Sequence, residues 1–202
     1  MSATETLRND HKQIKRLDKI IVKSYSALNA GKTIPFPDLE KITIIIPDFL
    51  DSIHYSREED SYFPCVASYD HLKKEIRALL IEHEFSRNIA SKITYHLKRW
   101  KNGEDSSEPV ARFLRTYSIY LNDHISKEED FFERAEKEIL SKEEEKEMFE
   151  QFSIRYSNYT KNGIYCKRTR LFGKSALVQK LVMLLILASK SMQYQVPQKE
   201  LR

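Results

Sequence analysis

The sequence predicts an all-α protein, an up-down-up-down four-helix bundle with extra helices at its C-terminal end. Of 202 residues only 4 are Gly and 6 are Pro, whereas charged residues make up 32%. That composition is typical of long amphipathic helices rather than of a sheet, which needs more turn residues. Apolar residues also recur at helical spacing in four long stretches joined by short links. Short links favour antiparallel packing of neighbouring helices.

The first two helices are expected at about 6–30 and 36–63. His11 lies on the apolar stripe of the first. Pro47 lies within the second and should kink it or break a turn, and Pro64 should end it. The apolar positions that predict these helices are Leu7, Ile14, Ile21 and Leu28 in the first, and Leu39, Ile42, Ile46, Leu50 and Ile53 in the second.

The third helix is expected to begin near Tyr69 and to end at Asn102-Gly103, and the fourth to begin near Glu108. Ser141 followed by Glu144 has the form of a capping box, which predicts the start of a shorter helix. The acidic run 143–147 should form a solvated face of that helix. The predicted stripes are Leu72, Ile76, Leu80, His83, Ala90 and Leu97, then Val110, Leu114, Tyr117 and Leu121.

One heptapeptide occurs twice. The segment 54–60 reads HYSREED and the segment 124–130, 70 positions later, reads HISKEED. In each copy a His and the Glu four residues later lie on one face of a helix. The pair offers one nitrogen and one carboxylate oxygen to a single point, as a transition metal requires. Aromatic residues follow each copy and are expected to form core and cavity walls: Tyr62, Phe63, Phe131 and Phe132.

Two further histidines fall at the height of these motifs. Counted from the predicted helix ends, His11, His54, His83 and His124 lie within about one turn of each other at ~1.5 Å per residue. His11 precedes His83 by 72 residues, so the two halves of the chain repeat. Burying four imidazoles and two carboxylates without a cation would be costly. The sequence therefore predicts a pseudo-twofold metal site.

Over about residues 4–155 this pattern resembles the hemerythrin-like HHE cation-binding domain, including Glu59 and Phe63-Pro64 between the motifs. The resemblance implies a centre of two non-haem iron ions, bridged by carboxylates and an oxo group, in a four-helix bundle. It also implies the ligand set: His11 and His54 for one iron, His83 and His124 for the other, and Glu58 and Glu128 as bridges.

Two positions depart from the oxygen-carrying members of that family. Those proteins have a second His four residues after the third-helix ligand, where this chain has Arg87. Arg87 cannot bind a metal, since it stays protonated, and is expected to hold an anion, a peroxide or a carboxylate such as Glu84. Those proteins also place the last carboxylate five residues after the fourth-helix His, so Glu129 is an alternative to Glu128. A ferritin-type site is set aside because its paired Glu-x-x-His motifs are missing.

The resemblance implies binding of, or reaction with, O₂, NO or peroxide in sensing, scavenging or redox protection. Such a chain would be a metal-binding or sensor protein rather than a dedicated enzyme. The alternatives are an iron-handling or iron–sulfur-repair protein that stores, senses or delivers iron, and a bundle whose site has no chemistry.

The expected organisation is a metal-binding bundle at 1–155 and a basic, apolar, helical extension at 156–202. Ten Lys or Arg and one Glu lie in 155–202, so this part carries +9 and the rest of the chain, with the total at +4, carries −5. The extension should dock on the bundle or on a second subunit; contact with a membrane surface is the alternative. No nucleic-acid-binding module is recognisable. Cys65 and Cys166 are expected as free thiols, and with no apparent signal peptide the protein is expected to be cytoplasmic.

Overall fold

The computed structural model describes residues 2–161, and within them the predicted all-α class is confirmed, with no β-strand. The predicted extension lies almost wholly outside these residues, so its docking and the boundary at 155 remain predictions. The elements are α1 (Ala3–Asn29), α2 (Phe36–Ile45), the π-helices η1 (Ile46–Tyr55) and η2 (Glu58–Tyr62), α3 (Phe63–Val66), the 3₁₀ turn η3 (Asp70–Leu72), α4 (Lys73–Lys101), α5 (Ser107–Glu138) and α6 (Lys142–Lys161).

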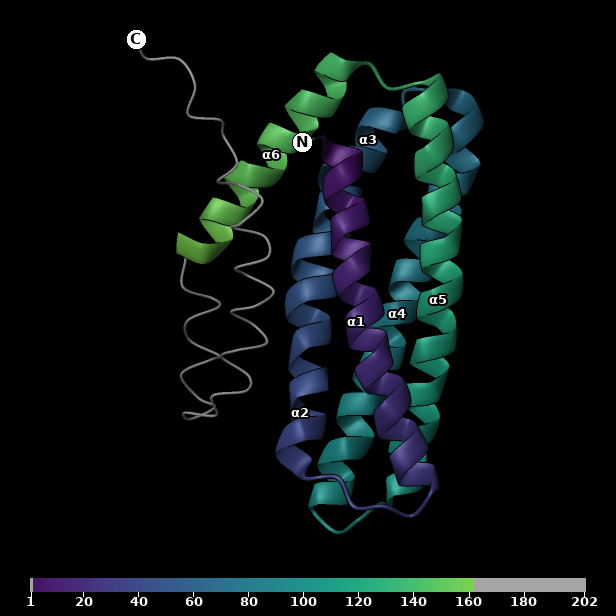
Figure 1. Cartoon of the computed structure of the whole chain (residues 1–202), viewed down its shortest axis with the longest axis vertical. Helices are drawn as coiled ribbons and strands as arrows, with labels where there is room; N and C mark the ends of the chain where they lie inside the picture. The colour runs from purple at the N-terminus through teal and green to yellow at the C-terminus, as the bar shows by residue number, and fades with distance from the viewer. Residues whose placement is uncertain (1, 162–202) are drawn as a thin grey trace. The chain divides into compact units, whose positions relative to one another are not determined.

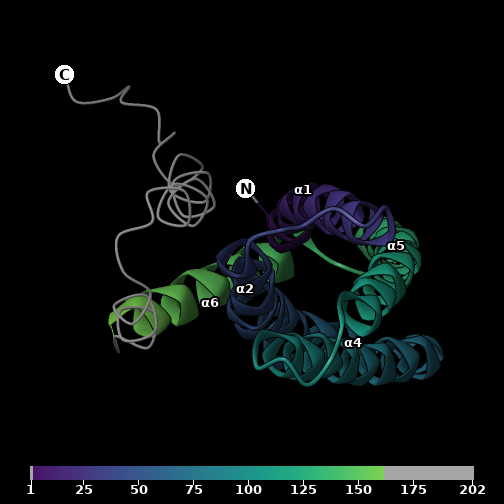
Figure 2. The same cartoon turned by 90° about the horizontal axis from the view of Figure 1, so that it is seen from below.

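Four long helical segments lie side by side (Figure 1). α1 packs on α5 and α5 packs on α4, while the continuous segment α2–η1 packs between α4 and α1. The view from below shows them around a common centre (Figure 2). α6 packs across α1 and η2 at one end of this group.

Local sequence signals account for the ends of the long helices. Ser2 caps α1, because its hydroxyl accepts a hydrogen bond from the Glu5 N–H at 3.1 Å. Gly31 and Gly103 follow α1 and α4 with φ of 69° and 78°. Glycine adopts this left-handed conformation without the steric penalty that a Cβ would bring, so both helices end where the sequence predicts.

The second helical segment changes its winding at Pro47. α2 ends at Ile45, and the next ten residues form the π-helix η1. Pro47 has no N–H to donate to the preceding turn. Ser52 donates from its hydroxyl to the carbonyl of Pro47, five residues back, at 2.9 Å, which suits the wider turn. The predicted kink is thus a change of helix type. The prediction that Pro64 ends the helix is wrong: it stands in the first turn of α3, where a missing N–H is tolerated.

The aromatic residues expected in the core are buried. Tyr62, Phe63, Phe131 and Phe132 are at most 2% exposed and form one cluster with Met148 and Phe152 of α6. The stripe predicted for α4 was wrong at Leu80, which is 36% exposed, whereas Leu79 is 2% exposed. Leu79 is four residues before the buried His83, so the inward face of α4 is centred one position away from Leu80.

α6 opens with the predicted capping box: the Glu144 N–H donates to the Ser141 hydroxyl at 3.2 Å, and the Ser141 N–H donates to the Glu144 carboxylate at 2.8 Å. The expected solvation of the run 143–147 fails at Glu145, which is 7% exposed. Its carboxylate accepts hydrogen bonds from the N–H of Thr4, at 3.0 Å, and from the Thr4 hydroxyl.

Thr4 lies in the first turn of α1, where N–H groups have no partner within the helix and a negative charge is favoured. A second bond, from the hydroxyl of Ser61 to the side-chain oxygen of Gln151 at 2.6 Å, joins α6 to η2. α6 therefore belongs to the described fold as a fifth long helix anchored at two places.

Replacing Glu145 with Ala should lower the free energy of unfolding by about 2 kcal/mol, because the Thr4 N–H is left buried without its acceptor. Glu147→Ala, at an exposed position of the same helix, is the matched control and should change the value by less than about 0.5 kcal/mol. Urea denaturation followed by circular dichroism measures both. Equal effects of the two substitutions would show that the Thr4 contact contributes nothing.

Candidate metal centre

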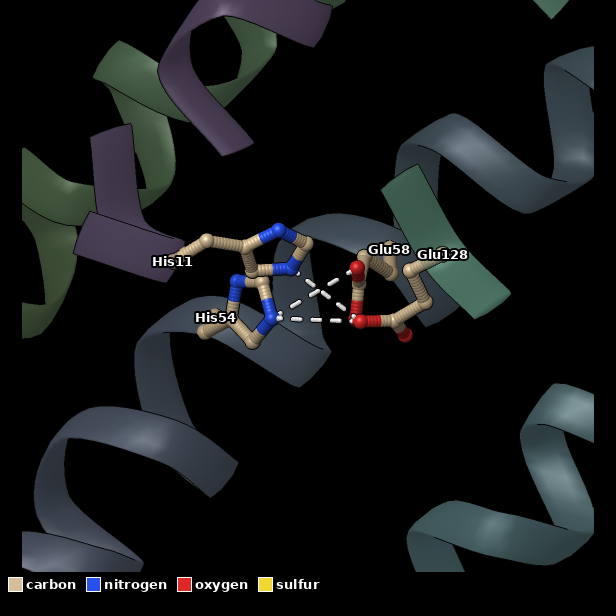
Figure 3. A group of neighbouring side chains, drawn as sticks. All are labelled: His11, His54, Glu58 and Glu128. Carbon is tan, nitrogen blue, oxygen red and sulfur yellow. Dashed lines mark hydrogen bonds and ion pairs between the residues drawn. The ribbon is translucent and has the colours of Figure 1, made fainter. Parts of the chain in front are cut away.

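The six sequence-predicted site residues converge in the middle of the bundle. Each helical segment contributes: His11 from α1, His54 and Glu58 from η1 and η2, His83 from α4, and His124 and Glu128 from α5. None of the six is more than 1% exposed. The imidazoles of His11 and His54 face the carboxylates of Glu58 and Glu128 (Figure 3).

The donor atoms form two overlapping groups, in each of which they lie within 4.8 Å of one another. Glu128 belongs to both groups. One of its oxygens is 3.1 Å from Nε2 of His11 and the other is 2.9 Å from Nε2 of His124. Its carboxylate thus spans the two groups. Their members are His11, His54, Glu58 and Glu128 in the first, and His83, His124 and Glu128 in the second.

Glu58 spans the same gap from the other side. Its Oε1 is 3.6 Å from Nε2 of His54, and its Oε2 is 3.4 Å from Nε2 of His83. Each carboxylate therefore presents one oxygen to each pair of histidines. This arrangement is what two bridging carboxylates between two cations require.

Four more carboxylates lie behind the histidines, and sequence reasoning did not assign them this place. Each faces the Nδ1 atom of one imidazole, which leaves Nε2 directed at the centre. A partner on the outer nitrogen fixes the orientation and the tautomer of a metal-binding His. The pairs are His11 with Glu129 at 2.7 Å, His83 with Glu59 at 2.6 Å, His124 with Glu82 at 2.8 Å and His54 with Asp10 at 3.7 Å.

The internal repeat relates these outer carboxylates to one another. Asp10 and Glu82 each directly precede an inner His, and Glu59 and Glu129 each directly follow an inner Glu. A basic side chain occupies the equivalent position of each half. Arg57 pairs with Asp10, and Lys127, 70 residues later, pairs with Glu82 at 2.6 Å. The doubled heptapeptide contains Glu59 and Glu129, whereas Asp10 and Glu82 are related only by the 72-residue offset between His11 and His83.

Glu129, the alternative bridging residue, lies on the outer side of His11 and is 32% exposed. Arg87 also lies outside the inner group. Its guanidinium pairs with Asp51 at 2.7 Å, with Glu59 at 2.8 Å and with Glu84 at 2.6 Å. The expected contact with Glu84 is therefore present as one of three. Through Glu59, Arg87 supports the outer nitrogen of His83.

The inner polar atoms fit a cation better than they fit one another. Neither oxygen of Glu58 and neither ring nitrogen of His54 makes a hydrogen bond within the described residues. Nε2 of His124 also lacks one of suitable geometry. Leaving buried polar atoms unsatisfied costs free energy, and much more for a charged group. A cation between these atoms would remove that cost, so the donor set fits a bound metal.

Protons balance these charges when no cation is bound. Burial raises the pKa of Glu58 well above its usual value, and the negative charge of Glu128 adds to the effect. Burial acts on Glu128 in the same direction, but the charge of His124 and a hydrogen bond from His11 hold its pKa well below the usual value. Burial alone would lower the pKa of His124, whereas Glu128 and Glu82 raise it to about 9. A cation must therefore displace protons as it binds.

The fold and the site define a helical protein with a buried, histidine- and carboxylate-lined cation site. The chain belongs to the hemerythrin HHE cation-binding domain family, whose model matches residues 2–135. Comparisons with curated proteins and with solved structures gave no match. No helix within residues 2–161 is both long and apolar enough to cross a membrane. The cytoplasmic location stays a prediction.

The stability of the metal-free protein should fall as pH rises from about 6.5 to about 9. His124 keeps its proton up to about pH 9 when folded, but loses it near pH 6.5 when unfolded. Its contribution is therefore complete below pH 6.5 and lost above pH 9, a difference of about 3 kcal/mol. The raised folded pKa of Glu58 also makes stability fall with rising pH, beginning above its usual pKa of about 4.5. Urea denaturation of chelator-treated protein across this range measures the slope; a flat or rising curve contradicts the charge assignment.

Proposed function

We propose that this protein holds two iron ions in a non-haem centre bridged by carboxylates and an oxo group. Four helices of alternating direction would surround it. The centre would bind or react with a small ligand such as O₂, NO or peroxide in sensing, scavenging or redox protection. The observation that carries this proposal is the position of Glu128, whose two oxygens face separate pairs of histidines.

The donor types favour iron. Each pair of histidines, with one oxygen from each carboxylate, gives two nitrogen and two oxygen donors. Imidazole and carboxylate suit iron, and no described cysteine lies among the donors, as many structural zinc sites would require. In the proposed assignment His11 and His54 hold one ion, His83 and His124 hold the other, and Glu58 and Glu128 bridge them.

When bound, the ions would supply redox chemistry. Each ion would have four protein donors, which would leave coordination positions for a small ligand. The chain's own residues do the rest. Outer carboxylates hold the imidazoles of His11, His83 and His124 in one orientation and tautomer. The carboxylate of Asp10 lies 3.7 Å from Nδ1 of His54. Complete burial of the donors keeps bulk water from the centre, and it strengthens every electrostatic interaction there.

Protein produced with sufficient iron should contain about two iron ions per chain and, after exposure to air, absorb in the near ultraviolet as oxo-bridged Fe(III) does. Glu128→Ala should lose iron from both positions, because Glu128 belongs to both donor groups. His71→Ala, which removes an exposed histidine outside both donor groups, is the control and should keep the wild-type content. Elemental analysis with absorption spectra measures these quantities. Stoichiometric zinc without iron uptake would overturn the metal assignment.

Iron-loaded protein should melt at a higher temperature than metal-free protein, because a ligand that binds only the folded state stabilises it by mass action. Lowering the pH should release the iron, since imidazoles must be neutral to bind a metal. Differential scanning calorimetry of the two forms, with iron release followed by a chelator dye, tests this. Identical melting temperatures would mean that the four histidines do not share a metal.

A further inference from the structure

A cavity of about 460 Å³ lies between η1 and α4, beside the half of the centre that contains His83. Its floor is formed by three buried side chains, Tyr55, Ser86 and Tyr117, which are at most 1% exposed. Apolar side chains, including Leu50 and Ala90, form much of its wall. Lys98 and the ion pair between Arg87 and Asp51 also line it, and the guanidinium carbon of Arg87 lies 5.7 Å from the centroid of the Tyr55 ring. The volume lies in the range of small-molecule sites.

Only one aromatic ring separates this cavity from a proposed metal-binding residue. The ring of Tyr55 stacks on the imidazole of His83, with centroids 3.8 Å apart and an interplanar angle of 15°. Tyr55 also lines the cavity. A molecule in the cavity therefore meets Tyr55, and the next group behind it is His83.

The hydroxyl groups at the floor are largely occupied by one another. Tyr55 donates to the hydroxyl of Ser86 at 2.9 Å, and the hydroxyls of Ser86 and Tyr117 are 3.1 Å apart. Two of the three hydroxyl hydrogens are used within this group. The three hydroxyls at the floor are therefore partly satisfied by one another, so the floor does not require a polar guest.

The cavity breaks the pseudo-twofold symmetry of the chain. With the 70- and 72-residue offsets of the repeat, Tyr55 corresponds to Ile125 and Ser86 corresponds to Ile14. Both isoleucines are at most 2% exposed and fill the core of the other half. The cavity and its hydroxyl floor thus lie in the same half of the chain as Arg87, which stands where the oxygen-carrying members of the family have a second histidine.

A second recess, of about 400 Å³, is lined by residues of α1 and α5 and reaches His11. Its lining is dominated by charged side chains, among them Arg8, Lys12, Lys15 and Glu129. These groups hold water strongly. A neutral apolar molecule gains free energy by leaving water for an apolar cavity, but gains little in a charged recess.

We propose that the cavity between η1 and α4 is the route by which a neutral diatomic gas, O₂ or NO, reaches the His83 and His124 half of the centre, with the Tyr55 ring as the last barrier. This inference rests on the proposed function. It assigns the small ligand's path and makes the centre more accessible on one side than on the other.

The test measures the rate at which NO binds to reduced, iron-loaded protein by stopped-flow absorption. Ala90→Phe fills the cavity and should slow binding by on the order of tenfold, within the range over which association rates vary among mutants of one site. Lys12→Phe adds the same ring to the charged recess and should leave the rate unchanged. If Ala90→Phe does not fold, Thr94→Phe in the same cavity takes its place.

Xenon binding in pressurised crystals is a second test of the cavity, and it does not depend on iron. Xenon should occupy the cavity in the wild-type protein and be absent from it in Ala90→Phe. Unchanged NO binding in a variant that excludes xenon would overturn the route, as would slowing in Lys12→Phe alone. Iron analysis of the wild-type protein precedes both measurements, so a failure of the proposed function would appear there, separately from a failure of the route.

Discussion

Two carboxylates buried in one layer of a helical bundle are the constraint on which this structure depends. Glu58 and Glu128 lie fully buried, and each raises the cost of ionising the other. A bundle that places them together needs positive charge there, either as protons on the acids and imidazoles or as metal ions. Four imidazoles around the pair, each with a carboxylate behind it, meet this need. Further out, Arg57, Lys127 and Arg87 balance the outer carboxylates, so charge alternates in successive shells.

Sequence periodicity was sufficient to predict the long helices and the convergence of the inner histidines and glutamates, because both predictions depend on residue spacing along a helix. A His and a Glu four residues apart share a face, and counting the rise along each helix placed the histidines at one height. Glycine located the helix ends at Gly31 and Gly103, where the backbone adopts positive φ.

Features that depend on contacts between helices could not be obtained in this way. Glu145 looked like part of a solvated acidic run, and its burial depends on where α6 meets the start of α1. Leu79 and Leu80 are adjacent, so a shift of one residue in the inward face decides which is buried. The π-winding after Pro47 is likewise invisible to a 3.6-residue template. Such a template has no place for the wider turn that leads to His54 and Tyr55.

The anchoring of α6 gives the centre a mechanical connection to the end of the described chain. Ser61, which binds Gln151, and Arg57, whose guanidinium lies over the Phe152 ring, flank Glu58 closely in sequence. Arg57 also holds Asp10 behind His54. Thermodynamic linkage is reciprocal, so if an ion that fixes Glu58 and His54 stabilises the docking of α6, undocking of α6 would weaken ion binding by the same free energy. Contacts of α6 thus reach the residues on either side of Glu58, one of the candidate metal ligands.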